Sequence, residues 1–458
     1  ATAKKNIQLM RTGVKIETEN PVILLSCPSC GRKLDANNYK FEEQTTSDID
    51  PDDFRPKRIR IKCHKDCFFG ISNDEDRYLP VAFIDEDIRN FCPSLLIATV
   101  DKFAQISWRW DYSSLFGKVG QYCAKDAFRP GNGGKLCNHI AVNWKDGKQK
   151  PYETISLTGG IDPPDLIIQD ELHLISGPLG TLTGLYETAI YDLCKKNGIG
   201  PKVIASTATT KKSSDQINHL FDKGTTKIFP SQGYRFGDSF FAEILPVSVE
   251  YPGKIYAGIC ATSVGGYTID ARIAATVLRK IRQIREKKTK YNFEGKDYSF
   301  SDEDLDPYYT LVEYYNTIKN LGASVRMYED SIPDFIKTII NTYEKIVPKQ
   351  ATKLEVKELT GRISHYDVPK TLEEVGTKLD DNNQAIDALL CTNMLSVGVD
   401  IDRLSVLLVN GQPGSTSEYI QATGRVGRKH PGLVVTNYTY TKSRDLSYFE
   451  NFLHFHTT

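Results

Sequence analysis

Short apolar segments recur along this chain, and helix-like stretches separate them. They read DLII at 165–168, KVIASTAT at 202–209, DALLCTNML at 387–395, SVLLVNG at 405–411 and LVVTNYTY at 433–440. Apolar runs of this kind suit strands that are buried on both faces of a sheet. Strands that alternate with helices favour a parallel, doubly wound arrangement, so the sequence predicts an α/β fold.

The alternation is interrupted around 230–255 and then begins again, which predicts two lobes of similar construction. A chain of 458 residues also suits about two or three compact units rather than one core. We therefore expect three segments, at 1–92, 93–240 and 241–458. Within them we expect an apolar strand in SLLIATV at 94–100, a long loop at 117–151 and a helix at 270–287.

The composition excludes some classes of protein. Lys+Arg and Asp+Glu both number 58, so no overall charge attracts nucleic acid, and any such binding must come from local patches. We expect no contact with a membrane, because no apolar run reaches the roughly 18 to 20 residues that a membrane span needs. Ten cysteines in a chain of this length do not indicate a disulfide scaffold, so a reducing, cytoplasmic location is expected.

Four cysteines form two close pairs, Cys27 with Cys30 in CPSC and Cys63 with Cys67 in CHKDC. Two such pairs can present four thiolates at about 2.3 Å from a tetrahedral Zn²⁺ ion. A structural zinc site in a small inserted module is the prediction, with His64 as a possible replacement for one ligand. An iron–sulfur cluster and a set of reduced, buried thiols are the alternatives.

Polar groups with possible chemistry follow several of the apolar segments. Asp170 and Glu171 come directly after one strand, and the cluster STAT at 206–209 ends another. Paired carboxylates at a strand end can hold Mg²⁺ and an attacking water. Further along, QATGRVGR at 421–428 carries Arg425 and Arg428, which we expect to project from one helical face toward a polyphosphate.

The order and spacing of these segments resemble the superfamily 2 helicases and translocases, from about residue 94 to the end. DELH at 170–173 is similar to their DEAD-like motif, and STAT, CTNMLSVGVDID at 391–402 and QATGRVGR are similar to their later motifs. The resemblance implies two RecA-like doubly wound lobes with a cysteine-rich zinc-binding insert in the first. More narrowly, QDELHLISGPLGTLTGLYE and the CPSC and CHKDC insert resemble the large helicase-like subunit of DISARM anti-phage defence systems.

Residue roles follow from the resemblance and are expectations. Asp170 would bind Mg²⁺, Glu171 would activate water, and Arg425 and Arg428, with Gln421 beside them, would stabilise charge on the γ-phosphate of ATP. Other residues expected at the nucleotide are Ser206, Thr207, Thr209, Gly398 and Asp400. Those expected at the nucleic-acid backbone are Thr99, Asp101, Lys102, Thr392 and Asn393.

The phosphate-binding loop of such enzymes is missing from this sequence. No GxxxxGK[ST] occurs, and the nearest segments, RTGVK at 11–15 and GNGGK at 131–135, lack the Ser or Thr after Lys. That loop combines backbone amides, a Lys and a Mg²⁺-binding hydroxyl, so this chain alone should bind ATP poorly. We expect a fragment or a split subunit, and a degenerate helicase fold is the alternative.

The leading hypothesis is an ATP-dependent DNA translocase or helicase core, acting on single- or double-stranded DNA with a second subunit of a bacterial defence complex. A non-catalytic DNA-binding or scaffolding subunit and an RNA helicase are the rivals. Two basic stretches could follow phosphates or could be merely solvated, namely the helix at 270–290 and the strand with Arg58, Arg60 and Lys62.

Overall fold

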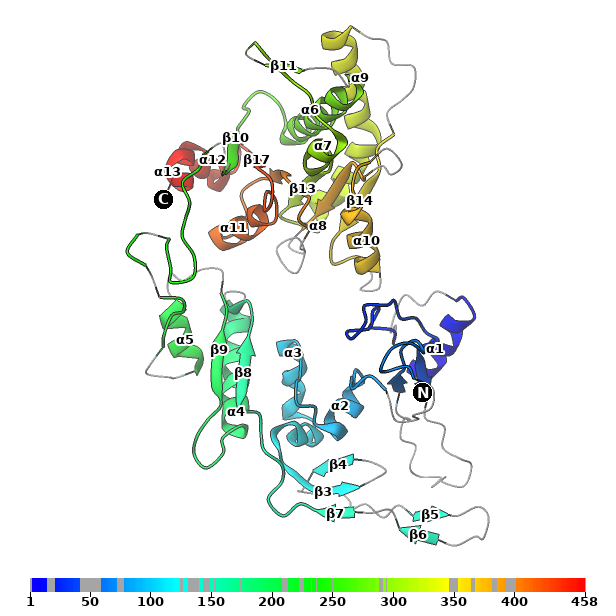
Figure 1. Cartoon of the computed structure of the whole chain (residues 1–458). Coiled ribbons are helices and arrows are strands. Elements are labelled where there is room, and N and C mark those ends of the chain that lie inside the picture. The colour runs from blue at the N-terminus through cyan, green and yellow to red at the C-terminus, as the bar shows by residue number, and fades with distance from the viewer. Residues whose placement is uncertain are drawn as a thin grey trace. The chain divides into compact units, whose positions relative to one another are not determined.

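The computed structural model describes most of the chain in two compact units, Ala1–Ile228 (unit 1) and Phe229–Thr458 (unit 2). The residues described are 2–14, 21–41, 59–71, 78–123, 127–130, 140–142, 149–151, 154–172, 175, 177–207, 213–221, 226–231, 233–235, 237–248, 251, 253–287, 291–293, 295–345, 353–363, 367–380, 385–392 and 401–457. Figure 1 labels the helices and strands of both units.

A six-stranded parallel sheet forms the centre of unit 2. In spatial order its strands are β10 (Lys254–Ile259), β17 (Gly432–Asn437), β16 (Val406–Asn410), β13 (Leu311–Tyr315), β15 (Ala388–Cys391) and β14 (Val356–Leu359). The central strands are apolar along nearly their whole length and are buried, as parallel strands covered on both faces must be. The predicted parallel sheet of the second lobe is confirmed.

Helices cover both faces of this sheet (Figure 1). On one face lie α6 (Gly266–Lys287), α8 (Ile318–Arg326) and α9 (Ile332–Ile339), with the π-helical turns η4 (Met327–Ser331) and η5 (Ile340–Glu344). On the other face lie α10 (Asp367–Gly376) and α11 (Thr416–Gly424). Each face has its own apolar core, so unit 2 is a doubly wound α/β lobe.

Smaller elements complete unit 2. They are α7 (Asp302–Tyr309), the hairpin β11 (Tyr291–Phe293) and β12 (Lys296–Tyr298), and the terminal helices α12 (Ser443–Glu450) and α13 (Phe452–Thr457). Helix α7 begins with a capping box, in which the Ser301 side chain accepts from the Asp304 N–H and the Asp304 carboxylate accepts from the Ser301 N–H. This reciprocal capping satisfies backbone donors that the first turn leaves without helical partners.

Three arginines of α6 are held in ion pairs within unit 2. The Arg279 guanidinium donates to Glu344 at 2.6 and 2.7 Å and to Glu286 at 2.8 Å. Arg282 pairs with Asp387, and Arg285 pairs with Asp302 at 2.7 Å. These arginines stabilise the packing of α6 against neighbouring segments, so neither phosphate binding nor simple solvation accounts for them.

In unit 1 the described residues form a two-stranded parallel sheet of β8 (Leu166–Gln169) and β9 (Lys202–Ala205). The connecting helix α4 (Gly177–Leu193) packs on one face, where Ile167 meets Ile190 and Phe116 in a small core. Helix α5 (Ser213–Phe221) follows β9 and packs against α4. A strand, a helix and a parallel strand in this order form a βαβ unit, so unit 1 shares the mixed α/β class.

The segment before β8 differs from its prediction in two ways. The expected loop at 117–151 contains short antiparallel strands, namely β3 (Val119–Cys123), β4 (Ala127–Pro130), β5 (Ile140–Val142) and β6 (Gln149–Pro151), and β7 (Thr154–Ser156) adds to the first two. Strands of three to five residues give too little alternation to be recognised in a sequence. The expected strand in SLLIATV is also wrong, because 94–99 form no strand and Leu95 and Ile97 are exposed.

The remaining elements of unit 1 lie before β3. The chain begins with α1 (Thr2–Arg11) and the antiparallel pair β1 (Tyr39–Phe41) and β2 (Ile59–Ile61), whose buried residues share a core with the cysteine pairs. Next come α2 (Asp85–Phe91), α3 (Val100–Phe103) and the 3₁₀ turns η1 (Ala104–Ser107) and η2 (Trp110–Phe116).

None of the helices described in the two units has the length and apolar composition that a membrane span needs.

A buried ion pair provides a test of this packing. Arg403 contacts Asp306 at 2.9 Å, and both side chains are buried. The guanidinium also donates to the Val375 carbonyl and the Thr310 hydroxyl. We predict that Arg403→Ala lowers the free energy of unfolding by about 3–5 kcal/mol, because Asp306 would be left buried without its counter-charge.

Urea unfolding followed by circular dichroism measures this loss. The exposed pair of Arg362 and Glu358 provides the control, because Arg362→Ala should cost less than about 1 kcal/mol. Equal losses in the two variants would contradict the prediction.

Candidate functional site

The two predicted carboxylates lie at the carboxyl end of β8. The Ser206 hydroxyl, at the end of β9, donates to the Asp170 carboxylate, and the Glu171 N–H donates to the same Asp170 oxygen at 2.9 Å. The Ser206 N–H in turn donates to the Gln169 carbonyl at 2.9 Å. Asp170 and Glu171 follow one strand and Ser206 follows another, and the structure brings the three residues together. We call these three residues the acid edge.

Glu171 adopts an uncommon backbone conformation. Its φ is 53°, in the left-handed region that non-glycine residues rarely occupy and that costs on the order of 1–3 kcal/mol. The next residue holds it there, because Leu172 is fully buried and its N–H donates to the Ser206 carbonyl at 2.9 Å. Strain of this kind at an exposed strand end is typical of functional sites.

A glutamine on α5 secures the turn after Glu171. The Gln216 amide donates to the carbonyls of Leu172, at 3.0 Å, and Ile175, at 2.7 Å. Leu172 and Ile175 also pack against Leu220 of the same helix. Sequence reasoning missed Gln216, since nothing in its local sequence distinguishes it from an ordinary helix residue.

One face of the β8–β9 sheet is open. Leu166 and Ile168 are 44% and 68% exposed, and Ile204 of β9 is 46% exposed. Because side chains alternate along a strand, these residues share their face with Asp170 and Ser206. Parallel sheets are nearly always covered on both faces, so this apolar surface is unusual and leads directly to the acid edge.

The covered face carries buried polar groups below the acid edge. Glu187 and Thr183 lie one turn apart on α4, and both are buried. Burial raises the pKa of Glu187 to about 7. Among the described residues, the Thr183 hydroxyl and the Gln169 carbonyl oxygen of the side chain have no hydrogen-bond partner. Helix α4 therefore carries a buried carboxyl group whose pKa lies near neutrality.

Other predicted residues of unit 1 are less closely placed. Thr207 follows Ser206 and is half-buried, whereas Thr209 lies outside the described residues. Thr99 is exposed just before α3, and the Lys102 ammonium lies 3.3 Å from the Asp85 carboxylate of α2. Asp101 lies within α3, but its side chain is outside the described part of the chain.

In unit 2, Arg425 and Arg428 lie in a turn between α11 and β17. The prediction that they project from one helical face is wrong, because α11 ends at Gly424 and Arg425 is its C-cap. The helix cannot continue through Gly427, whose φ is 62°. Gln421 lies half-buried in the last turn of α11, as its position in the motif suggests. We call residues 425–428 the arginine turn.

The arginine turn is anchored by its middle residues. Val426 is fully buried in the core beneath α11, and the Gly427 N–H donates to the Leu404 carbonyl at 2.8 Å. A Cβ at Gly427 would lie 2.6 Å from the Gly432 Cα, so only glycine fits. Arg428 is exposed and its Nε donates to the Gly424 carbonyl at 3.3 Å.

Thr392, another predicted residue of unit 2, lies at the opposite edge of the sheet. Thr392 follows the carboxyl end of β15 and is buried, whereas the arginine turn precedes the amino end of β17. Because all six strands are parallel, these two positions are at opposite edges. Asn393, Gly398 and Asp400 lie outside the residues that the structure describes.

Buried acids and amides interlock near the carboxyl ends of the central strands. Asp270 of α6 accepts hydrogen bonds from Asn437, at 2.7 Å, and from Asn410. The Tyr328 hydroxyl donates to Glu313 at 2.7 Å. Burial raises the pKa of Asp270 to about 7 and that of Glu313 to about 8. Asp270, Glu313, Asn410 and Asn437 were not recognised in the sequence as site residues. The hydrogen bonds of Asn410 and Asn437 to Asp270 fix the ends of β16 and β17.

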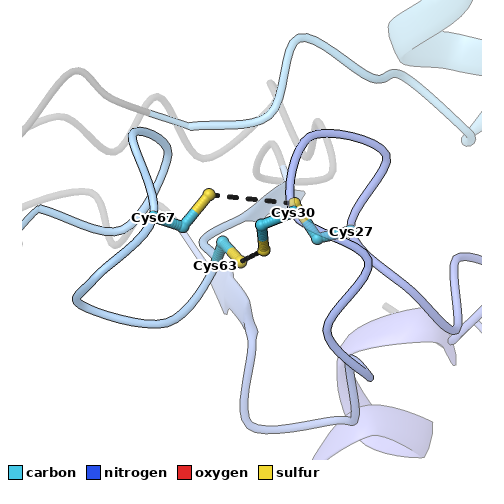
Figure 2. Close-up of side chains that lie close together, drawn as sticks. All are labelled: Cys27, Cys30, Cys63 and Cys67. Carbon is cyan, nitrogen blue, oxygen red and sulfur yellow. Dashed lines mark hydrogen bonds between the residues drawn. The ribbon is translucent and has the colours of Figure 1, made fainter.

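The four predicted cysteines form one cluster (Figure 2). The Sγ atoms of Cys27 and Cys67 are 3.9 Å apart, those of Cys30 and Cys63 are 3.5 Å apart, and all four lie within 4.8 Å of one another. Ligands at about 2.3 Å from a tetrahedral ion would be about 3.8 Å apart. The thiols are free, so the spacing suits a tetrahedral metal ion rather than disulfides.

Tight turns hold the cysteines in place. The Gly31 N–H donates to the Cys27 carbonyl and the Cys67 N–H donates to the His64 carbonyl. His64 itself bonds to the Lys33 carbonyl through Nε2, which accounts for its ring outside the cluster. Burial opposes ionisation of Cys27, but hydrogen bonds from the backbone of Cys30 and Ser29 lower its pKa to about 7. Burial raises the pKa of Cys63 to about 12.

Comparison with known proteins finds similarity to helicases. Residues 328–430 match the helicase conserved C-terminal domain. The DISARM protein DrmA of Bacillus paralicheniformis (strain ATCC 9945a / NCIMB 11709 / CD-2) is 38% identical over 442 residues, which cover 94% of this chain and 36% of DrmA. This chain therefore spans about a third of the length of that relative.

Two further comparisons concern shorter or more distant similarity. The Druantia protein DruE of Escherichia coli (strain UMEA 4076-1) is 30% identical over 146 residues, 30% of this chain and 8% of DruE. The crystal structure of the DUF1998 helicase MrfA bound to DNA and AMPPNP matches with a TM-score of 0.41 and 15% identity, over 65% of this chain and 34% of MrfA.

The two glycines of the arginine turn region provide a matched test. We predict that Gly427→Ala lowers the free energy of unfolding by about 1–3 kcal/mol, because a Cβ there meets the Gly432 backbone and φ is positive. Gly424→Ala should be neutral or slightly stabilising, because no atom lies within 4 Å of a Cβ at that position. Denaturant unfolding of both variants measures the difference, and a neutral Gly427→Ala would refute the close packing.

Proposed function

We propose that this chain, a superfamily 2 helicase similar to the DISARM protein DrmA, has a role in bacterial anti-phage defence. In this proposal it is the ATP-hydrolysing core of a DNA translocase. The observation that carries the proposal is the acid edge, where a strained Glu171 follows a hydrogen-bonded Asp170 at the end of a parallel strand. Ligands of open α/β sheets bind at such carboxyl ends.

Each acid has a distinct task in this proposal. The magnesium ion, when bound with ATP, supplies charge neutralisation of the phosphates. Asp170 would hold the hydration shell of Mg²⁺, and the Ser206 hydroxyl would fix the orientation of that carboxylate. Glu171 would orient the attacking water and accept its proton. In this proposal the backbone conformation of Glu171 would set the direction in which its side chain leaves the strand end.

The arginine turn would stabilise the negative charge of the γ-phosphate. Guanidinium groups suit this task because they are always charged and bind phosphate oxygens in a fixed fork geometry. Arg428 is exposed, and the buried Val426 between the two arginines anchors the backbone of the turn. Gln421, one turn earlier on α11, would bind near the same phosphate.

In this proposal the phosphate cradle comes from another segment, because the sequence contains no GxxxxGK[ST] motif. The open face of Leu166, Ile168 and Ile204 supports this proposal, since it is an apolar surface that ends at the acid edge. A strand and helix carrying the phosphate-binding loop would cover it. DrmA, with about a third of its length matched here, has ample length for such a segment.

Two rivals remain to be tested against this function. A non-catalytic DNA-binding or scaffolding subunit would need neither the strained Glu171 nor the hydrogen bond between Ser206 and Asp170, and both favour catalysis. An RNA helicase would share every feature described. The similarity to a DISARM protein supports a role in defence. With DNA and a second defence subunit as the proposed partners, Thr99, Lys102 and Thr392 would lie near the nucleic acid.

The cysteine cluster is proposed to bind one structural Zn²⁺ ion through Cys27, Cys30, Cys63 and Cys67. Four sulfur ligands leave no open coordination position, so the ion would stabilise the module rather than take part in catalysis. The apolar core that includes three of these cysteines, together with Tyr39 and Ile61, is small and would depend on the metal for stability.

Substitution of Glu171 tests its role as the general base. In the longer protein that carries its phosphate-binding loop, Glu171→Gln should reduce DNA-stimulated ATP turnover by at least about 100-fold while nucleotide binding persists. Glu303→Gln, an exposed position at the start of α7, is the control and should retain turnover. Full turnover in Glu171→Gln would remove the assignment, and absence of turnover in the unsubstituted protein would favour the scaffolding alternative.

Another prediction concerns the metal. Elemental analysis of the purified protein should find about one zinc per chain, and Cys63→Ser should lose it and destabilise the module. Cys92→Ser, outside the cluster, should retain it. Iron with visible absorbance would indicate an iron–sulfur cluster instead, and protein without either metal would end the metal hypothesis.

A further inference from the structure

Lys254 lies beside the arginine turn, although it is far from it in the sequence. It begins β10 and pairs in register with Gly432 at the start of β17. Its ammonium donates to the Thr423 carbonyl, in the last turn of α11, at 3.0 Å. Its Cε would lie 3.3 Å from a Cβ at Gly427, and its Cγ would lie 3.1 Å from a Cβ at Gly432. The lysine stem therefore packs against both glycines.

This contact caps α11 at the point where the arginine turn begins. The last carbonyls of a helix have no helical donors, and a lysine can satisfy one of them through a charge-assisted hydrogen bond. Thr423 is buried, so its carbonyl needs such a partner more than an exposed one would. Two residues later the chain reaches Arg425, whose N–H donates to the Ala422 carbonyl.

Capping alone does not account for the charge of Lys254. Among the described residues, no carboxylate forms an ion pair with it, and the charged group that affects it is Arg428. Burial and the positive charge of Arg428 both lower the pKa of Lys254. A half-buried cation next to another cation is unfavourable in the absence of an anion. An anion near the arginine turn would reverse that unfavourable interaction.

We infer that Lys254 is a positioning residue of the arginine turn, one that fixes the end of α11 and provides a third positive charge for a bound polyphosphate. The inference rests on the proposed function, because it takes the γ-phosphate of ATP as the anion. It extends that function to a residue on a different strand, outside the motif that carries the arginines.

The experiment compares three substitutions of Lys254 and one control in the longer protein that carries its phosphate-binding loop. Lys254→Met keeps the stem that packs on the glycines and loses the charge, whereas Lys254→Ala loses both. We expect Lys254→Met to lower kcat about tenfold or more, as loss of a charge-assisted hydrogen bond does, with a smaller change in KM. Lys254→Arg should restore much of kcat. Lys337→Met, exposed on α9, is the matched control and should behave as wild type.

A second readout uses this chain without ATP hydrolysis. Inorganic tripolyphosphate should raise the melting temperature of the unsubstituted chain and of Lys337→Met, but much less that of Lys254→Met. A role in folding alone would lower the melting temperature of every Lys254 variant while leaving kcat and the tripolyphosphate shift unchanged, and that result would overturn the inference.

The outcomes separate this inference from the proposed function. If Glu171→Gln is inactive while Lys254→Met has wild-type kcat and KM, only the role of Lys254 fails. If the unsubstituted longer protein hydrolyses no ATP, the proposed function fails, and the tripolyphosphate shift alone then decides whether Lys254 serves an anion site.

Discussion

The parallel hydrogen-bonded ladder is the constraint on which most other features depend. It directs the carboxyl end of every strand to one edge. Thr392, Asn410 and Asn437 therefore lie at that edge, although each ends or follows a different strand. The same ladder directs the segments that precede strands to the other edge, where Lys254 meets the arginine turn. Both edges depend on apolar packing of the strands between two layers of helices.

Features set by local pattern could be predicted from the sequence. The buried strands of unit 2, the carboxylates after β8 and the paired cysteines all follow from spacing along the chain. Features set by contacts between distant segments could not. The pairing of Arg279 with Glu344 and the contact of Lys254 with Thr423 join residues far apart in the sequence. The end of α11 was missed because the effect of Gly427 depends on its close contact with Gly432.

The two units differ in how completely their sheets are covered. Unit 2 has two apolar cores, one on each face of six strands. Unit 1 offers two parallel strands with one face packed on α4 and the other exposed. An isolated pair of parallel strands gains little stability from its own ladder. The acid edge therefore depends on contacts with α4 and α5, such as those of Gln216, for its geometry.

The left-handed backbone at Glu171 lowers the stability of the fold at the residue whose carboxylate is proposed to act in catalysis. Glycine accepts this conformation without strain, and asparagine accepts it more readily than glutamate does. Either of these two replacements would relax the backbone and make the fold more robust, and either would also delete the carboxylate. Selection for thermal stability alone would thus favour variants without the carboxylate, which would be inactive. Glutamate would be retained at this position only under selection for ATP hydrolysis.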